Sequence, residues 1–260
     1  MIINAHAHIF PDKIAERAVS GINQFYDLEM GFDGKLSTLL ELEGKAGVDK
    51  FIVQSVATVP AQVQSINNFI ADCVKQYPDK LIGFCTIHPD YPDIEEELDR
   101  AAEMGLKGVK IHPDFQRFCI DEEKALRIYR HIEGKMPILV HTGDYRYEYS
   151  KPERMARVLD MFPDLDVIGA HFGGWSEWES ASKAYRGRKI YVDTSSTMYA
   201  LPPEKVRELI DIFGVDYVLF GTDYPMWSAE EELKMLSKVP LTEEEREKIL
   251  HGNAERLLRL

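Results

Sequence analysis

Short apolar runs rich in β-branched residues alternate with amphipathic stretches along the whole chain. Apolar runs of this length, bounded by turn residues, are typical of buried strands. Eight runs qualify: Ile2–His6, Phe51–Ala57, Leu81–Ile87, Gly108–His112, Ile138–His141, Val167–His171, Ile190–Thr194 and Tyr217–Asp223. The pattern predicts eight strands, and the stretches between them indicate how the strands are connected.

Helical periodicity or capping signals occupy most of the intervening stretches. The predicted helices are Ser37–Lys45, Ala61–Tyr77, Ile94–Met104, Asp121–Ile132, Pro152–Met161, Glu177–Ala184, Pro203–Phe213, Ser228–Ser237 and Glu243–Leu258. Strands that alternate with helices in this way predict a (β/α)₈ barrel, and a chain of 260 residues fits one such barrel. A doubly wound open sheet, the structural alternative, is favoured by a glycine-rich turn after the first strand, and HAHIFPDK is not such a turn. Because no linker, repeat or composition break interrupts the chain, we expect one domain over residues 1–260.

Two stretches without a predicted helix follow predicted strands. Residues Ile9–Leu36 follow the first strand and contain several aromatic residues between short helical patches. Residues Thr142–Lys151 follow the fifth strand and contain three tyrosines. Because the loops that follow barrel strands build the active face, we expect both stretches to form substrate walls or a lid.

Composition excludes some classes of partner. Hydrophobic residues at 45% and charged residues at 29% are ordinary for a globular protein, but the formal net charge is −13. Nucleic acids and anionic membrane surfaces require a basic face, so neither is an expected partner. The sequence also shows no apolar stretch of membrane-spanning length and no secretory signal layout, and its three cysteines lack a metal-binding spacing. We therefore expect a cytoplasmic protein with reduced thiols that acts on a small molecule.

Five of the predicted strands end in or near residues that can bind a metal or transfer a proton. In strand order these are His6 and His8, then Lys110 and His112, then His141, His171 and Asp223. Residues two apart on a strand point to the same side, so His6 and His8 can face one small volume. Two such imidazoles are half of a divalent-metal site, although an isolated pair is as readily explained by structural histidines. In a barrel all strand C-termini surround one mouth, and so many polar strand ends are hard to explain by core packing.

Six motifs carry a resemblance to a known family: HAH, GVKIHP, VHTG, AHFGG, FGTDYP and the closing ILHGNAERLL. Together they resemble the amidohydrolase superfamily, and most closely its amidohydrolase-related branch, which includes aminocarboxymuconate-semialdehyde decarboxylase and related metal-dependent hydrolases. The likeness extends over nearly the whole chain, with the motifs in the family's order. The resemblance implies a barrel that binds a single divalent ion, usually zinc.

The resemblance also implies roles for individual residues. The metal ligands would be His6, His8, His141 and Asp223, with one coordination position left for water or a substrate oxygen. Such a site is cationic and would acidify bound water towards neutral pH. His171 matches the family's non-ligand histidine, which polarises substrate or relays a proton, and its alternative role is a fourth imidazole ligand. Asp223 would also accept a proton from the metal-bound water in a hydrolytic enzyme.

Lys110 lies on the strand that supplies a carboxylated, metal-bridging lysine in two-metal amidohydrolases. Because this branch usually works with one metal, we expect Lys110 to be unmodified. His112 lies on the same side of the strand and either lines the pocket or is structural. Arg146, Trp175 and Tyr224 are further candidates for contact with substrate, the aromatic ones by stacking on a planar molecule.

The expected function is hydrolysis of an ester, lactone or amide of a small, carboxylated molecule by metal-activated water. The first alternative is nonoxidative decarboxylation at the same site. Decarboxylases of this branch have longer chains and an arginine that holds the substrate carboxylate. Arg146 and Arg17 are the available arginines, but the short chain favours hydrolysis. A non-catalytic metal-binding scaffold is the second alternative, and a homodimer is compatible with either enzyme.

Overall fold

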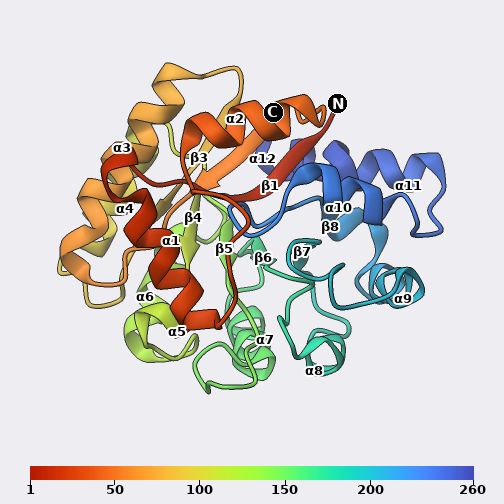
Figure 1. The fold of residues 1–260 in the computed structure, drawn as a ribbon. Coiled ribbons are helices and arrows are strands. Elements are labelled where there is room, and N and C mark those ends of the chain that lie inside the picture. The colour runs from red at the N-terminus through yellow and green to blue at the C-terminus, as the bar shows by residue number, and fades with distance from the viewer.

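The computed structural model describes residues 1–260 and contains one sheet of eight parallel strands (Figure 1). The strands pair in chain order and are β1 (Ile3–His8), β2 (Lys50–Gln54), β3 (Leu81–Thr86), β4 (Gly108–Ile111), β5 (Ile138–Val140), β6 (Val167–Gly169), β7 (Tyr191–Asp193) and β8 (Val218–Leu219). All eight predicted strands are present, with ends that differ from the predicted ranges by a few residues. β1 is longer than predicted and includes His8.

Backbone hydrogen bonds between the two outermost strands close the sheet. Ala5 N donates to Phe220 O at 2.7 Å, and Asp223 N donates to His6 O at 2.9 Å. His8 N donates to Tyr224 O at 2.7 Å, so the contact continues beyond the assigned end of β8. The predicted (β/α)₈ barrel is confirmed.

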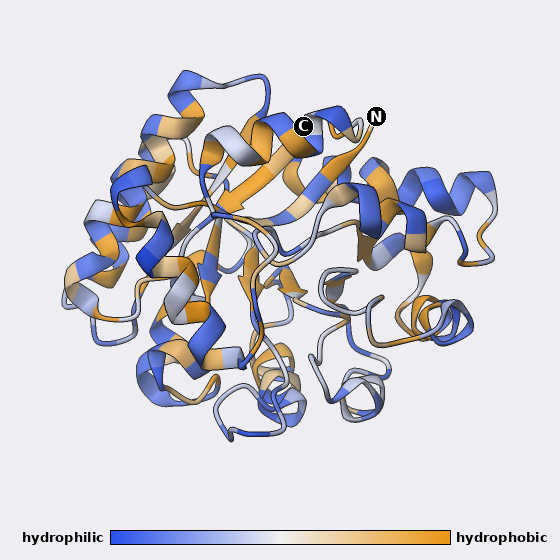
Figure 2. Cartoon of the chain, in the orientation of Figure 1, coloured by the Kyte–Doolittle hydropathy of each residue, from blue (hydrophilic) through white to orange (hydrophobic).

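Helices surround the barrel and turn their hydrophilic sides outward (Figure 2). They are α1 (Asp12–Tyr26), α2 (Leu36–Lys45), α3 (Val63–Gln76), α4 (Ile94–Glu103), α5 (Pro113–Gln116), α6 (Glu123–Ile132), α7 (Pro152–Met161), α8 (Trp178–Ala184), α9 (Pro203–Phe213), α10 (Ala229–Leu236), α11 (Glu243–Glu247) and α12 (Asn253–Leu258). Short 3₁₀ turns lie at Pro60–Gln62 and Val215–Tyr217. None of the helices combines the length and the apolar character needed to cross a bilayer.

Two apolar layers form the core. The larger one lies between the strands and the surrounding helices and contains 52 buried residues. The smaller one joins side chains from seven of the strands, such as Ile3, Ile52 and Leu139, with Leu257 and Leu258 of α12. Because α12 packs against β8 and shares this layer with Ile3 at the start of β1, it closes the end of the barrel at which the strands begin, and the polar strand ends gather at the other end.

α1 is one continuous helix of 15 residues in a stretch where the sequence predicted only short helical patches. Its apolar residues Ile14, Ala18, Ile22 and Phe25 recur at helical spacing, but Ala15 is its single fully buried residue, so the apolar side of the helix is not packed into the core. The helix lies across the mouth of the barrel, in front of β4 and β5 in Figure 1, and its Phe25 ring packs 4.4 Å from that of Phe115. The predicted helix Glu243–Leu258 is also altered, because a π turn at Lys248–Gly252 separates α11 from α12.

Candidate metal centre and substrate cavity

The side chains of His6, His8 and Asp223 converge at the mouth of the barrel. The two Nε2 atoms of His6 and His8 are 3.1 Å apart. Asp223 Oδ1 lies 3.4 Å from His6 Nε2 and 3.6 Å from His8 Nε2. Two imidazoles and a carboxylate that present one atom each to a common point are suitable ligands for a divalent ion.

The surroundings of His6 favour the protonation state that a metal ligand requires. Its Nδ1 donates to Asp193 Oδ2 at 2.9 Å, so Nε2 carries the lone pair that faces His8 and Asp223. Burial lowers the pKa of both His6 and His8 well below the ordinary value, and Lys110 lowers it further. Both imidazoles are therefore neutral, as metal ligands must be. Together with the carboxylate of Asp223 they fit the divalent ion that the resemblance implies.

His141 and His171 lie next to this group. His141 Nδ1 is 3.1 Å from His171 Nε2, and the rings of His6 and His171 stack at 5.3 Å. His171 Nδ1 lies 3.1 Å from Ser195 O, which only accepts, so this nitrogen carries the proton and Nε2 carries the lone pair. Burial lowers the pKa of His171 to about 4. His171 is a neutral acceptor at neutral pH.

Strained backbone aims several of these side chains. His171, Ser196 and Asp223 have φ angles of 59°, 46° and 63°. This left-handed region costs a residue with a Cβ roughly 1–2 kcal/mol, and such residues gather at functional sites. Ser196 Oγ donates to Asp223 Oδ2 at 2.6 Å and thereby fixes the carboxylate with its other oxygen towards the histidines.

Lys110 places a cation in the same cluster. Its side chain is fully buried, and Nζ lies 3.3 Å from His6 Nε2. Burial lowers the pKa of Lys110, while Asp223 and Asp193 act in the opposite direction. The unmodified state of Lys110 stays a prediction.

His112 and Tyr26 form one wall of the site. The His112 ring stacks on His141 at 3.9 Å with an interplanar angle of 9°. Phe115 N donates to His112 Nδ1 at 3.3 Å, so the proton of His112 is on Nε2, which lies 2.8 Å from the Tyr26 hydroxyl. Because the Tyr26 oxygen accepts this bond, its own O–H is left to donate to another group.

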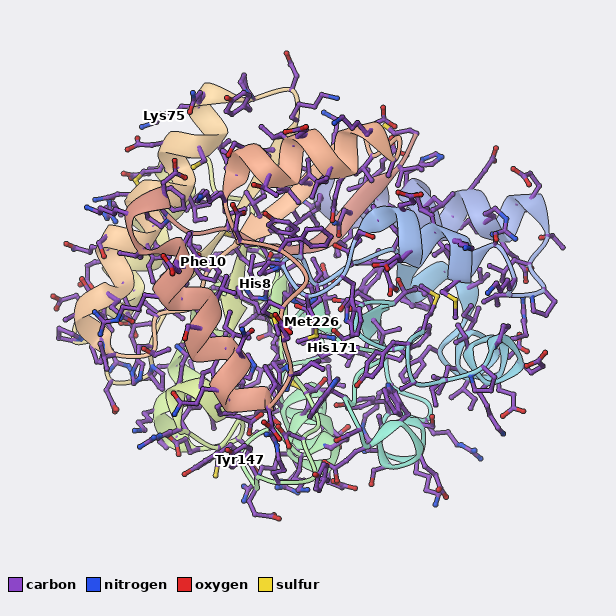
Figure 3. All side chains as sticks on the ribbon, viewed as in Figure 1. His8, Phe10, Lys75, Tyr147, His171 and Met226 are labelled. Atoms are coloured by element: carbon purple, nitrogen blue, oxygen red, sulfur yellow. The ribbon has the colours of Figure 1, made fainter.

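A cavity of about 1020 Å³ contains these groups and extends outward between α1 and α3. Its inner wall consists of His6, His8, Lys110, His112, His141, His171, Asp223 and Tyr26. The outer arm is lined by Lys13 and Arg17 of α1 and by polar residues of α3 such as Ser65 and Asn68. Figure 3 places His8 and His171 near the centre of the molecule and Lys75 of α3 at its edge. This volume is at the upper end of the range for small-molecule sites.

Three predicted substrate contacts lie outside the cavity wall. Arg146 donates to both oxygens of Asp144 and to Phe25 O at 2.7 Å, so it ties the end of α1 to the loop after β5. The Trp175 ring packs against that of Tyr26 at 5.2 Å. Tyr224 is buried behind the barrel wall, where its hydroxyl donates to Lys35 O at 2.8 Å. Arg146 and Trp175 stabilise the rim, and Tyr224 packs on the opposite face of the wall from Asp223.

Sequence reasoning missed four polar residues that contact the site. They are Tyr26, Asp193, Ser195 and Ser196. The sequence could have indicated Asp193, because it lies one residue before the end of the predicted strand Ile190–Thr194, close to the position that Asp223 has in its own strand. Tyr26 carried no signal beyond its place in a stretch that was expected to form a substrate wall.

Comparison with known sequences identifies the family. The family model described as amidohydrolase matches residues 3–260. The chain belongs to this family. Among curated relatives, a γ-resorcylate decarboxylase from Polaromonas sp. strain JS666 is 22% identical, with 75% of each chain covered. A γ-resorcylate decarboxylase from Rhizobium radiobacter is 21% identical, with 86% of each chain covered.

Solved structures of similar proteins have the same fold. An uncharacterized TIM-barrel protein from Bordetella bronchiseptica superposes with a TM-score of 0.82 at 24% identity and covers 99% of this chain and 98% of its own. A dihydroxybenzoic acid decarboxylase from Polaromonas sp. JS666, with bound manganese and 2-nitroresorcinol, gives 0.78 at 16% identity over 100% and 97% of the two chains.

These comparisons bear on the expected reaction and metal. The named relatives are decarboxylases, so they support the alternative enzyme and give no support to hydrolysis. Manganese in a similar protein supports a divalent ion but does not confirm zinc.

Proposed function

We propose that this protein is a metal-dependent, nonoxidative decarboxylase of a small aromatic carboxylic acid that bears a hydroxyl group. The observation that carries the proposal is the convergence of His6, His8 and Asp223 beside a buried cation, Lys110, on the inner wall of one large cavity. The activities of the named relatives support this reaction over hydrolysis.

The divalent ion would be held by His6, His8, His141 and Asp223. When bound, it supplies positive charge that attracts the anionic oxygens of the substrate. Imidazole and carboxylate donors suit both manganese and zinc. Lys110 adds a second positive charge within the same cavity and would help to hold the carboxylate in place.

Aromatic decarboxylation needs a proton at the ring carbon that bears the carboxylate. The carbon–carbon bond then breaks, its electron pair returns to the ring, and carbon dioxide leaves. We assign the proton donor as Asp223, because it is the carboxyl group on the inner wall of the cavity, beside the histidines. His171 is a poorer acid, because its one proton is directed at Ser195 O. After the reaction, Asp223 would regain a proton from water in the cavity.

Two further groups would orient the substrate. His171 Nε2 accepts a hydrogen bond from a substrate hydroxyl, and the free O–H of Tyr26 donates to a substrate oxygen. Arg17 is the arginine that lines the cavity, so it replaces Arg146 as the candidate for contact with a distal anionic group.

The test is whether carbon dioxide is released. Protein loaded with Mn²⁺ is incubated with hydroxybenzoates, including 2,6-dihydroxybenzoate, and with a matched panel of aryl esters and lactones. We expect labelled carbon dioxide from a carboxyl-labelled acid, and none from the His6→Ala, His8→Ala double variant. Hydrolysis of the esters or lactones without any carbon dioxide from the acids would overturn the proposal.

A further inference from the structure

Two neighbouring residues beside the site each have a buried polar atom without a hydrogen-bond partner. The atoms are His141 Nε2 and Asp114 Oδ1. The two residues are 1% and 2% exposed, and the other carboxylate oxygen, Oδ2, lies 3.7 Å from His141 Nε2. This separation is too long for a hydrogen bond, and neither His141 Nε2 nor Asp114 Oδ1 has a hydrogen-bond partner. Buried polar atoms of this kind need an explanation, because an unmet one costs roughly 1–3 kcal/mol.

The side chains of Asp114 and His141 are both held in place by other contacts. Asp114 lies in α5, directly after β4, and Ser150 Oγ donates to its Oδ2 at 2.6 Å. The His141 ring is fixed by the parallel His112 ring at 3.9 Å. One edge of His141 therefore faces the carboxylate of Asp114, and the other edge, with Nδ1, faces His171 at 3.1 Å.

The contact of His141 with His171 places its proton on Nδ1, whereas binding an ion through Nδ1 would require the proton on Nε2. His171 Nε2 carries a lone pair, so His141 Nδ1 donates to it here, and His141 Nε2 then turns a lone pair towards Asp114. A ligand nitrogen must instead carry the lone pair, so an ion held by Nδ1 requires the proton on Nε2. That proton would point directly at the carboxylate of Asp114.

We propose that Asp114 is a positioning residue for the metal centre, which stabilises the His141 tautomer with its proton on Nε2 and its lone pair on Nδ1. The role matches that of Asp193, whose carboxylate accepts from His6 Nδ1 at 2.9 Å and leaves His6 Nε2 for the ion. The inference rests on the proposed function only in taking His141 as a ligand.

Other uses of Asp114 fit the contacts less well. A second cation held by His112, Asp114 and His141 would need a free nitrogen on His112. His112 has none, because Phe115 N donates to its Nδ1 and its Nε2 faces Tyr26. In a purely structural role, Asp114 would anchor the loop after β5 through Ser150. This role explains the hydrogen bond to Oδ2 but not why His141 Nε2 has no hydrogen-bond partner.

Two variants separate the positioning role from the structural one. Asp114→Asn keeps an oxygen for Ser150 but removes the carboxylate, and Ser150→Ala removes the loop anchor but keeps the carboxylate. We measure the affinity of each purified protein for Mn²⁺ by competition with a chelator, and the melting temperature as a check on folding. Loss of an outer carboxylate partner typically weakens metal binding by roughly 10- to 100-fold.

We expect a loss of this size in Asp114→Asn and a change below about threefold in Ser150→Ala. Wild-type affinity in a folded Asp114→Asn protein, or equal losses in the two variants, would overturn the proposal.

A measurement on the wild-type protein keeps the proposal testable if Asp114→Asn does not fold. With diamagnetic Zn²⁺ bound, long-range proton–nitrogen correlation spectra report which nitrogen of His141 is protonated, and His141→Gln identifies its signals. We expect the proton on Nε2 and the ion on Nδ1. A His141 that binds Zn²⁺ through Nε2, or not at all, would refute the proposal. Neither readout requires turnover, so a failure of decarboxylation would not affect the result.

Discussion

The barrel wall where β8 returns to β1 carries a buried polar cluster on each face, and the two clusters differ in how fully they are hydrogen bonded. On the outer face, Asn4 Nδ2 donates to Glu43 Oε2 at 2.6 Å and to Thr222 Oγ1 at 2.8 Å. Thr222 Oγ1 donates to Glu43 Oε1 at 3.0 Å, and Thr222 N donates to Asn4 Oδ1 at 3.1 Å. The side chains of this outer cluster bond to one another.

The inner cluster uses neighbouring residues of the same strands. His6 Nε2, His8 Nε2 and Asp223 Oδ1 lie within 3.1–3.6 Å of one another, and the neutral rings offer fewer protons than these three atoms could use as hydrogen bonds to each other. Buried lone pairs that point at one another are found where they bind a ligand. At other buried positions polar atoms form hydrogen bonds. The comparison predicts that changes to the inner face alter metal binding and rate, whereas changes to the outer face alter stability.

The largest expected effect is loss of the metal. The purified protein should contain about one divalent ion per chain, and the His6→Ala, His8→Ala double variant should contain none, because it lacks two ligands. Elemental analysis measures both. Full occupancy in the double variant would show that the ligands are elsewhere, and two ions per chain or a carbamate on Lys110 would contradict the single-metal assignment.

Variants of His171 and Asp223 sharpen the comparison, because they should differ in their effects on metal binding and on kcat. His171→Asn should leave metal content near normal and lower kcat by roughly a hundredfold, because the substrate hydroxyl loses the acceptor that orients it. Asparagine also tolerates the left-handed backbone at this position. Asp223→Asn should weaken metal binding as well, and excess metal should restore occupancy without restoring the rate.

Metal titration and steady-state kinetics measure both variants. Loss of metal in His171→Asn would make His171 a ligand. Near-normal turnover in fully loaded Asp223→Asn would mean that Asp223 only holds the ion and that His171 is the better candidate for the proton donor.

The two clusters also show what the sequence can predict. Strand ends reveal inner-face residues such as His141 and Asp223, because a polar side chain that closes an apolar run is conspicuous. Nothing in a sequence marks Asn4 and Glu43 as partners, since their contact depends on where α2 packs. The course of α1 was not predicted either, because its apolar side lines a cavity instead of packing into the core, and no local pattern shows that it crosses the barrel mouth. Local patterns thus predict the barrel and the residues at its mouth. The position of α1 and the partners of carboxylates such as Asp193 depend on contacts between residues far apart in the sequence.

The outer cluster should affect stability without affecting the metal. Glu43→Ala leaves the amide of Asn4 and the hydroxyl of Thr222 without their carboxylate partner and opens a small cavity. We expect the free energy of unfolding to fall by about 3 kcal/mol, from unmet buried donors and lost packing. Denaturant unfolding gives this value, and Mn²⁺ affinity should stay within about threefold of wild type. A large loss of Mn²⁺ affinity in the folded variant would show that the two faces are coupled.

The smallest expected effect concerns the pH dependence of that stability. Burial raises the pKa of Glu43 from 4.5 to about 7, although the bonds from Asn4 and Thr222 favour the ionised form. A carboxyl group whose pKa is higher in the folded protein stabilises the fold below its unfolded pKa. Between pH 4.5 and 7 the unfolded chain releases this proton while the folded protein keeps it, so the stabilisation is lost as pH rises and the difference is constant above pH 7.

Glu43→Gln removes this titration and retains an amide that can bond to both partners. We therefore expect the free energy of unfolding of wild type, relative to that of Glu43→Gln, to fall by on the order of 2 kcal/mol between pH 4.5 and 7. The upper limit for this change is about 1.4 kcal/mol for each unit by which the pKa is raised. Urea unfolding of both proteins across this range measures the difference, in which the other titrating groups of the chain cancel. A constant difference, or one that grows in favour of wild type as pH rises, would mean that Glu43 is ionised in the folded protein. The outer cluster would then hold a buried charge, and it would resemble the inner one more closely than its complete hydrogen bonds suggest.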